Sequence, residues 1–440
     1  MSILAVDLVN LLKSHQMLTI QTVRDQKDIV IQRLSVKNFD AKEIIEQVLE
    51  IDSNRRSTQA ELDNLLAAQN NLAKQVGDLF KSGKQAEAND LKNKSTALKE
   101  ESKLLADKLS MLESQMNDLL VRVPNMPSSA VPKGKTPEEN EVVYQSVEAL
   151  PVLDASALPH WDIAAKYDLI DFEMGVKLTG AGFPVYKGKG AKLQRALINF
   201  FLDKASAAGY GEVQPPILVN EDSGFGTGQL PDKEGQMYHV GIDNLYLIPT
   251  AEVPVTNIFR DVILKAEELP VKLTAYTPCF RREAGSYGKD VRGLNRLHQF
   301  DKVEIVQVAH PEQSYAILES MREYVASLLH ELELPFRTLR LCGGDMSFAS
   351  ALTYDMEVYS AAQKRWLEVS SVSNFESFQS NRLKLRYREG SNKPTLAHTL
   401  NGSALALPRI VAALLENNQT PSGIRIPKAL IPYTGFDTIG

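Results

Sequence analysis

Two heptad patterns in the N-terminal region, which has no proline between Met1 and Leu120, constrain the fold more than any other sequence feature. In each pattern, mostly apolar residues recur with alternating spacings of four and three, as is typical of helices that supercoil around each other. The first seam consists of Ile44, Val48, Ile51, Arg55, Thr58, Leu62, Leu65, Gln69, Leu72, Val76 and Leu79. The second consists of Leu91, Ser95, Leu98, Ser102, Leu105, Leu109, Leu112, Met116, Leu119 and Val123. We therefore expect two long helices packed along these seams.

A break at Ser82 and Gly83 separates the two seams. Because the seams match in length, the break favours an antiparallel hairpin of one chain over about 40–121. An intermolecular coiled coil is the alternative. A helix over 44–79 would be about 54 Å long at about 1.5 Å per residue, so the hairpin is expected to reach a large partner. Lys81 and Lys84 at its tip could meet phosphate groups, and a merely solvated surface is the alternative there.

A proline-rich segment, VPNMPSSAVPKGKTPEENE, contains four prolines and shows no periodicity. We interpret residues 123–141 as a linker between a helical arm, residues 1–122, and a second domain, residues 142–440. In that domain several β-rich runs, among them LTAYTPCF and FDKVEIVQV, follow one another without a helix between them. We expect an α+β fold in which helices flank an antiparallel sheet. The sequence has no glycine-rich loop of the P-loop or Rossmann kind.

Only two cysteines occur among the 440 residues, Cys279 and Cys342, and they lack metal-ligand spacing. We therefore expect neither zinc nor a disulfide framework, and a reducing, cytoplasmic setting is the default. Since the net charge is −6, a polyanionic partner would have to meet local basic patches. Residues 1–16 carry Asp7 within an apolar run and lack a basic lead-in, so we expect neither a signal peptide nor a membrane span.

A long glycine-bearing loop separates the strand-like run that ends in FRRE from the run FDKVE. Because residues i and i+2 of a strand share a face, Arg281 and Glu283 should point the same way. On the returning strand, Phe300, Lys302 and Glu304 should also share a face. An arginine for a phosphate, a carboxylate for an amino group and an aromatic ring for a base would then be neighbours, and the loop could close over them as a lid. The alternative is a cross-strand ladder of ion pairs.

Two other strings have the same i, i+2 design. IPTAEVP should place Thr250 and Glu252 on one face of a strand. LEVSS should place Glu368 and Ser370 on one face, opposite Val369. A carboxylate with a nearby hydroxyl suits magnesium bound to nucleotide phosphates. The alternative for each string is a strand that is half exposed.

The string HTLNGSALALPR predicts a strand-like HTL, then Asn401, Gly402 and Ser403, and then a helix with Arg409 near its start. A helix N-terminus with an arginine favours anions. The alternative is an ordinary capped core helix.

These residues together carry a resemblance to a known family. FRRE with its loop and FDKVE resembles motif 2 of class II aminoacyl-tRNA synthetases, GYGEVQPPILV with Pro216 resembles motif 1, and LNGSALALPR resembles motif 3. PTAEVP, LEVSSVSNFESFQSNR and HTLNGS, together with the arm and the closing IPKALIPY, resemble bacterial seryl-tRNA synthetases. The resemblance extends from about Met17 to Tyr433, so residues 1–16 are expected to be an extension to the family pattern.

The resemblance implies an ATP site. Arg281 would hold the α-phosphate, Glu283 would accept from the adenine amino group, and Phe300 would stack on the adenine beside Leu297. Glu368 would carry magnesium with Ser371 beside it. Arg409 would meet the γ-phosphate, so the groups that act in catalysis would be Arg281, Glu283 and Arg409. The remaining ATP-contacting residues would be Arg282, Val369 and Ser370.

The resemblance also implies a serine pocket and partners. The pocket would be lined by Thr250, Ala251, Glu252, Glu304 and Ser403. The implied enzyme activates L-serine with Mg-ATP and transfers it to tRNA(Ser), and to tRNA(Sec) if the organism has one. The arm would reach the long variable arm of the tRNA, and motif 1 would form a homodimer.

Two other functions remain as alternatives. A related ligase that loads an amino acid onto a carrier protein would lack the long helical arm. An inactive tRNA-binding paralogue should have lost Arg281, Glu304 or Arg409, and all three are present. The sequence also departs from the family pattern: Gly182 stands where many relatives have arginine, and Ala404 and Pro408 stand where motif 3 commonly has glycine.

Overall fold

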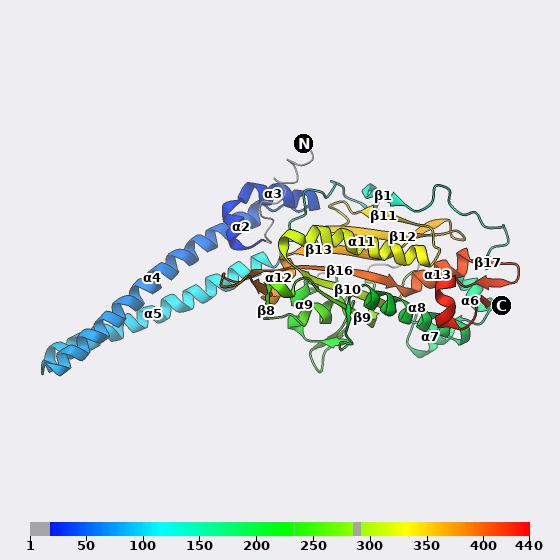
Figure 1. Ribbon diagram of the computed structural model, residues 1–440. Coiled ribbons are helices and arrows are strands. Elements are labelled where there is room, and N and C mark those ends of the chain that lie inside the picture. The colour runs from blue at the N-terminus through cyan, green and yellow to red at the C-terminus, as the bar shows by residue number, and fades with distance from the viewer. Residues whose placement is uncertain (1–17, 233, 285–291) are drawn as a thin grey trace. The chain divides into compact units, whose positions relative to one another are not determined.

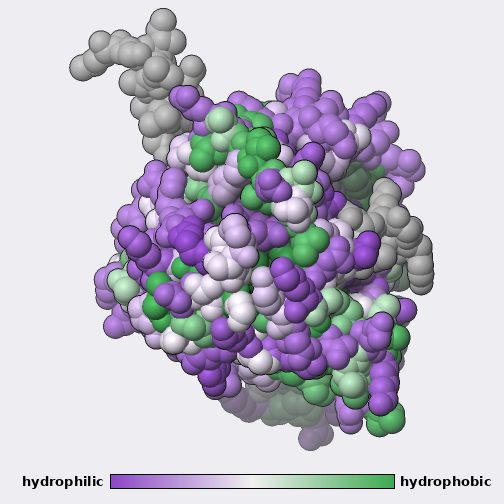
Figure 2. Space-filling view, turned by 90° about the vertical axis from the view of Figure 1, so that its right-hand side faces the viewer, coloured by the Kyte–Doolittle hydropathy of each residue, from purple (hydrophilic) through white to green (hydrophobic). Residues whose placement is uncertain are grey.

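The computed structural model describes residues 18–232, 234–284 and 292–440, which divide into two compact units, Leu18–Met126 and Pro127–Gly440. None of the helices among these residues has the length and apolarity needed to cross a membrane. The face in Figure 2 is mostly hydrophilic, with scattered hydrophobic patches.

The first unit is built on two long helices that run side by side, α4 (Lys42–Lys81) and α5 (Gln85–Leu120) (Figure 1). They form an antiparallel hairpin of one chain, as the seams predict, with Gly83 in the left-handed conformation (φ +75°) at the turn. Every predicted seam position is buried or partly buried. The seam residue Gln69 donates across the hairpin to the Leu98 carbonyl at 2.6 Å and to Ser102 Oγ at 2.9 Å.

The short helices α2 (Ile20–Asp25) and α3 (Lys27–Leu34) share a hydrophobic core with the base of the hairpin. At this base Asp52 is buried although it lies off the predicted seam. Its carboxylate pairs with Arg24 Nε at 2.9 Å and with Arg55 Nη2 at 3.0 Å. The heptad pattern could not reveal this residue, because α2 rather than α5 supplies the Arg24 that pairs with it.

The second unit contains an eight-stranded sheet in the order β1-β11-β12-β13-β16-β10-β9-β4. All neighbouring strands are antiparallel except the β4–β9 pair, so the predicted antiparallel sheet is confirmed. The strands are β1 (Glu141–Gln145), β11 (Phe336–Arg340), β12 (Leu352–Ser360), β13 (Arg365–Glu376), β16 (His398–Ala406), β10 (Gln299–Ala309), β9 (Val271–Phe280) and β4 (Gly211–Glu212).

Helices α8 (Gly188–Ala207) and α11 (Ser314–Glu331) cover one face of this sheet, the back face. From α8, Gln194 donates to Asp301 of β10 at 2.8 Å. From α11, Ser314 accepts from Asn374 of β13 at 3.0 Å. Because side chains alternate along a strand, Lys302 and its i+2 neighbour point to the opposite, front face. The front face carries the candidate site.

Candidate functional site

A buried ion pair lies at the centre of the front face, on strand β10. Lys302 Nζ is 2.7 Å from Glu304 Oε2 and donates to Thr250 Oγ1 at 2.8 Å. Thr250 Oγ1 in turn donates to Glu304 Oε2 at 3.1 Å, and all three side chains are buried. Ser403 of β16 lies directly opposite Glu304 in the strand register. The Glu304 carboxylate is therefore held in a fixed position by Lys302 and Thr250, with the small polar residue Ser403 beside it.

Glu252 joins this cluster from a helix rather than from a strand. The prediction of a strand for IPTAEVP is wrong: Thr250 lies in a turn, Ala251 is fully buried, and Glu252 is the first residue of α10 (Glu252–Asn257). Pro254 is compatible with this helix because the first-turn N–H groups have no intrahelical partner. Thr250 Oγ1 accepts from the Glu252 backbone N–H at 3.2 Å.

Burial raises the pKa of the Glu252 carboxyl from 4.5 to about 7, and the nearby Glu304 charge adds to the rise. Gln379 and Lys302 oppose this shift. Gln379 Nε2 donates to Glu252 Oε1 at 2.6 Å, while Gln379 Oε1 accepts from Thr399 Oγ1 at 2.7 Å. The carboxyl groups of Glu252 and Glu304 thus have one ammonium, that of Lys302, between them. The charge balance of the cluster therefore favours binding of a second cationic group.

Arg281 lies next to Phe300, as predicted, but it does not lie on a strand. Strand β9 ends at Phe280, so Arg281 and Glu283 are outside it and the i, i+2 argument does not hold for them. The Arg281 guanidinium lies 5.3 Å from the centre of the Phe300 ring, and its Nε donates to the Pro249 carbonyl at 3.4 Å. Glu283 adopts a positive φ of 49° and pairs with Arg296 Nη1 at 2.7 Å.

The segment that returns to β10 is held against Gly182. His298 N donates to the Gly182 carbonyl at 2.9 Å, and its ring stacks on Phe183. His298 also donates from Nδ1 to the Arg281 carbonyl at 2.9 Å. Gly182 has a φ of +85°, and a Cβ there would lie 2.5 Å from His298 Cδ2. This close approach explains glycine at a position where the family resemblance suggested arginine.

The other residues expected near the nucleotide in this region are Arg282 and Leu297. Arg282 N donates to the Gln236 carbonyl at 2.8 Å, and Leu297 is buried in the returning segment. The predicted lid, the glycine-bearing loop, falls largely on residues 285–291, which lie outside the described residues.

A β-bulge in β13 changes which side chains share the front face. Met356 pairs with Ser370, but Glu357 pairs with Glu368, so Val369 is the extra residue. The prediction that Glu368 and Ser370 share a face is therefore wrong. Ser370 points to the back and donates to the Ser403 carbonyl at 2.6 Å.

The bulge places Glu368 on the same face as Ser371, together with Asp355 and Glu357 of β12. Burial raises the pKa of Asp355 well above its usual value, and the Glu368 charge adds to the rise. Sequence reasoning missed Asp355, although the alternation in TYDMEVYS could have indicated it. Over residues 18–232, 234–284 and 292–440, no three His, Cys, Asp or Glu side chains form a metal-binding group.

Arg409 reaches the same region from the first turn of helix α13 (Leu407–Asn417). Its Nη1 donates to the Glu368 carbonyl at 2.7 Å and lies 3.7 Å from Glu368 Oε2. Its Nε donates to the Asn295 carbonyl at 3.2 Å. The predicted helix with Arg409 near its start is confirmed, but the preceding strand is longer than HTL: β16 runs on through Asn401–Ser403 to Ala406, and the helix begins with Leu407 and Pro408.

The residues matched by family models agree with this architecture. Residues 238–418 match "tRNA synthetase class II core domain (G, H, P, S and T)", and residues 17–127 match "Seryl-tRNA synthetase N-terminal domain". The domain built on the antiparallel sheet is thus that of a class II aminoacyl-tRNA synthetase.

Similar proteins narrow the assignment further. The chain is 51% identical to a serine–tRNA ligase of Salinibacter ruber, over 96% of this chain and 99% of the relative. It is 45% identical to a serine–tRNA ligase of Desulfitobacterium hafniense, over 96% of this chain and all (100%) of the relative. The crystal structure of seryl-tRNA synthetase from Pyrococcus horikoshii complexed with ATP matches with a TM-score of 0.90 at 31% identity, covering 96% of this chain and 99% of that one. The chain belongs to the seryl-tRNA synthetase family.

The raised pKa of Glu252 predicts a pH dependence of stability. The folded carboxyl, with a pKa of about 7, keeps a proton that the unfolded one, near 4.5, releases. This contribution is therefore present below about pH 4.5 and is lost as the pH rises to about 7, by an amount on the order of 3 kcal/mol. Glu252→Gln should remove the dependence, so its melting temperature should gain on the wild type between pH 5 and pH 8. Glu221→Gln, at an exposed carboxyl, is the control, and parallel pH profiles for wild type and Glu252→Gln would refute the assignment.

Proposed function

We propose that the protein activates L-serine with ATP to form seryl-adenylate and then transfers the seryl group to the terminal adenosine of tRNA(Ser). The observation that carries this proposal is the buried cluster of Lys302, Thr250 and Glu304, which lies on the same face of β10 as Phe300, the ring over which Arg281 lies. The curated relatives that share its length and about half its sequence are serine–tRNA ligases.

The chemistry of the cluster suits serine. The substrate ammonium would take its place beside Glu304 and Thr250, while Glu252 would supply the second carboxylate. Ala251 and Ser403 would keep the pocket small. A site that hydrogen-bonds a substrate hydroxyl rejects alanine, because its own buried polar groups would be left unpaired.

The ATP site follows from the groups around Phe300. Adenine would stack on the ring face over which Arg281 lies in this structure, so Arg281 would move to the α-phosphate. Glu283 would accept from the adenine amino group, with the Leu297 backbone beside it and Arg282 on the nucleotide side. The serine carboxylate oxygen then attacks the α-phosphorus and pyrophosphate leaves. Positioning and charge stabilisation would carry this step, since no protein nucleophile is needed.

Magnesium fits the front face near β13. Glu368, whose side chain is 51% exposed, and Ser371 would hold it. Because the Ser370 hydroxyl points to the back face, Val369 and Ser370 would complete the ATP-contacting string through their backbone. Such a donor set suits Mg²⁺, which usually binds to one or two carboxylates and substrate phosphates. When bound, the ion neutralises phosphate charge. Arg409 would meet the γ-phosphate from the same side.

The tRNA partner is proposed for the helical arm. Its tip carries the exposed Lys81 and Lys84, which pair with the similarly exposed Asp78 and Glu87. Such lysines can exchange these partners for RNA phosphates at little cost. The arm would recognise the shape of the long variable arm of tRNA(Ser), and of tRNA(Sec) where the organism has one.

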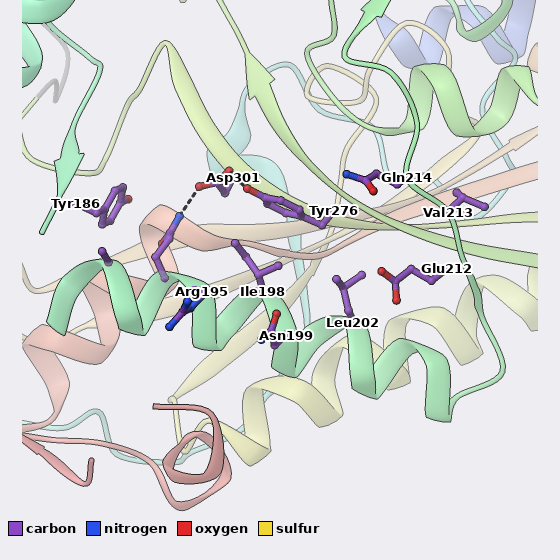
Figure 3. A pocket seen from close by; sticks show the side chains of 12 residues that line it. Tyr186, Arg195, Ile198, Asn199, Leu202, Glu212, Val213, Gln214, Tyr276 and Asp301 are labelled. Atoms are coloured by element: carbon purple, nitrogen blue, oxygen red, sulfur yellow. Dashed lines mark hydrogen bonds between the residues drawn. The ribbon is translucent and has the colours of Figure 1, made fainter. Parts of the chain in front are cut away.

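A homodimer is proposed for the face formed by α8 and the segment after β4. A cavity of about 530 Å³ lies between them. In Figure 3, Arg195, Ile198, Asn199 and Leu202 line one stripe of α8, and Glu212, Val213 and Gln214 lie opposite. The segment belongs to the motif-1-like sequence, and a second copy would cover this mixed apolar and polar surface. The enzyme is proposed to work in the cytoplasm.

Arg281→Ala should reduce serine-dependent ATP–pyrophosphate exchange by about 100-fold or more, because it removes the charge that stabilises the reacting phosphate. The melting temperature should stay near that of the wild type, and Arg388→Ala, at an exposed arginine, should retain exchange. Near-normal exchange by Arg281→Ala would show that the phosphate clamp lies elsewhere, and no exchange by folded wild type would refute the proposed function.

Shortening the arm should separate the two steps. Deleting 65–78 and 88–101 removes two heptads from each helix and keeps the seam in register with the turn at Gly83. Pyrophosphate exchange should stay within about twofold of the wild type, whereas charging of tRNA(Ser) should fall by about 100-fold because the phosphate contacts at the tip are withdrawn. Normal charging by the shortened protein would contradict the proposed role of the arm.

A further inference from the structure

A fully buried histidine and glutamate lie behind the nucleotide region and have no part in the chemistry described so far. His160, the first residue of α6 (His160–Lys166), and Glu416 of α13 are both 0% exposed. Glu416 Oε1 accepts from the His160 backbone N–H at 2.9 Å and from Nδ1 at 2.7 Å. The other ring nitrogen, Nε2, accepts from the Leu294 backbone N–H at 2.8 Å.

These contacts fix the tautomer of the imidazole. A backbone N–H can only donate, so Nε2 must be unprotonated, and the ring hydrogen must be on Nδ1, where the Glu416 carboxylate accepts it. Burial raises the pKa of Glu416, but hydrogen bonds from His160 and Ser360 more than offset it, and the net shift is downward. Glu416 is therefore an ionised acceptor that orients the ring.

Leu294 lies in the segment that returns from the loop to β10, and the next residue is a partner of Arg409. The Asn295 carbonyl accepts from Arg409 Nε at 3.2 Å. The Asn295 side chain donates to Gln363 Oε1 at 3.2 Å, and Gln363 Nε2 donates to Glu416 Oε1 at 2.9 Å. Helix α13 thus carries Arg409 at its start and, two turns later, Glu416, which orients the histidine that holds the segment bonded to Arg409.

Two further contacts tie the same segment to the start of α6. The Arg292 guanidinium lies 4.8 Å from the centre of the Trp161 ring and 3.8 Å from Asp162 Oδ1. Gly293, with a φ of +68°, approaches so closely that a Cβ there would lie 2.2 Å from His160 Nε2. The segment is seated directly on the histidine.

We propose that His160 is a positioning residue of the ATP site: oriented by Glu416, it fixes the segment 292–297 and thereby the Asn295 carbonyl that aligns Arg409. This inference rests on the proposed function, because it takes Arg409 as a group that meets ATP. His160 touches no substrate itself. Its loss should therefore weaken ATP binding and leave the serine pocket around Glu304 intact.

Two pairs of variants test the proposal. Gly293→Ala pushes the segment off His160, and Gly435→Ala is its matched control, because Gly435 has a similar φ of +72° and no atom within 4 Å of the added Cβ. His160→Asn can still donate to Glu416 but does not reach Leu294, whereas His160→Gln can place an oxygen acceptor near the position of Nε2.

In pyrophosphate exchange, Gly293→Ala and His160→Asn should raise the KM for ATP about tenfold and change the KM for serine less than about twofold. His160→Gln and Gly435→Ala should stay near the wild type. If the KM values for ATP and serine rise together with a fall in melting temperature, or if Gly293→Ala behaves like Gly435→Ala, the proposal is overturned. Gly293→Ala decides the matter even if His160→Asn does not fold.

Hydrogen exchange of the Leu294 amide gives a readout that does not depend on activity. The amide should be protected in the wild type and in Gly435→Ala, and it should lose protection in Gly293→Ala. Unchanged protection would overturn the proposal that His160 positions the segment. By contrast, absence of serine-dependent pyrophosphate exchange in the wild type, with the Leu294 amide protected as expected, would refute the proposed function and not the positioning role of His160.

Discussion

The ion pair between Lys302 and Glu304 is the interaction around which the second unit is organised. Two opposite charges buried 2.7 Å apart are tolerable only if every remaining polar atom has a partner, and Thr250 bridges both. The arrangement requires β10 to be a central strand and the turn at Thr250 to lie against it. With Glu252 close by, the cluster has one ammonium for two carboxylates, which is the basis for proposing that the ammonium group of a small amino acid binds there.

The nucleotide side depends on backbone segments that side chains hold in place. The returning segment 292–298 is fixed at one end by His160 and at the other by His298, and it brings Asn295 to Arg409. Neither histidine is part of the proposed chemistry. Positioning of this kind suits a reaction in which the protein supplies no nucleophile and in which geometry and charge placement must lower the barrier.

The sequence predicted those parts of the fold in which apolar residues repeat regularly, every three or four residues in the helices and every second residue in the strands. The seams from Ile44 to Val123 predicted the hairpin, and alternating runs predicted the antiparallel sheet. The predictions were wrong where the alternation of side chains along a strand is interrupted. The bulge at Val369 moves Ser370 to the back face, and Glu252 begins a helix where alternation suggested a strand. Contacts between distant segments, such as Arg24 with Asp52 or His160 with Leu294, leave no local pattern in the sequence.

A crystal structure with a non-hydrolysable seryl-adenylate analogue would test the proposed site most directly. We expect the analogue's ammonium within hydrogen-bond distance of Glu304 and Thr250, its adenine against the Phe300 ring, and the Arg281 guanidinium moved from that ring to the phosphate position. An analogue bound elsewhere, or one whose ammonium lies away from Glu304 while Arg281 still covers Phe300, would contradict it.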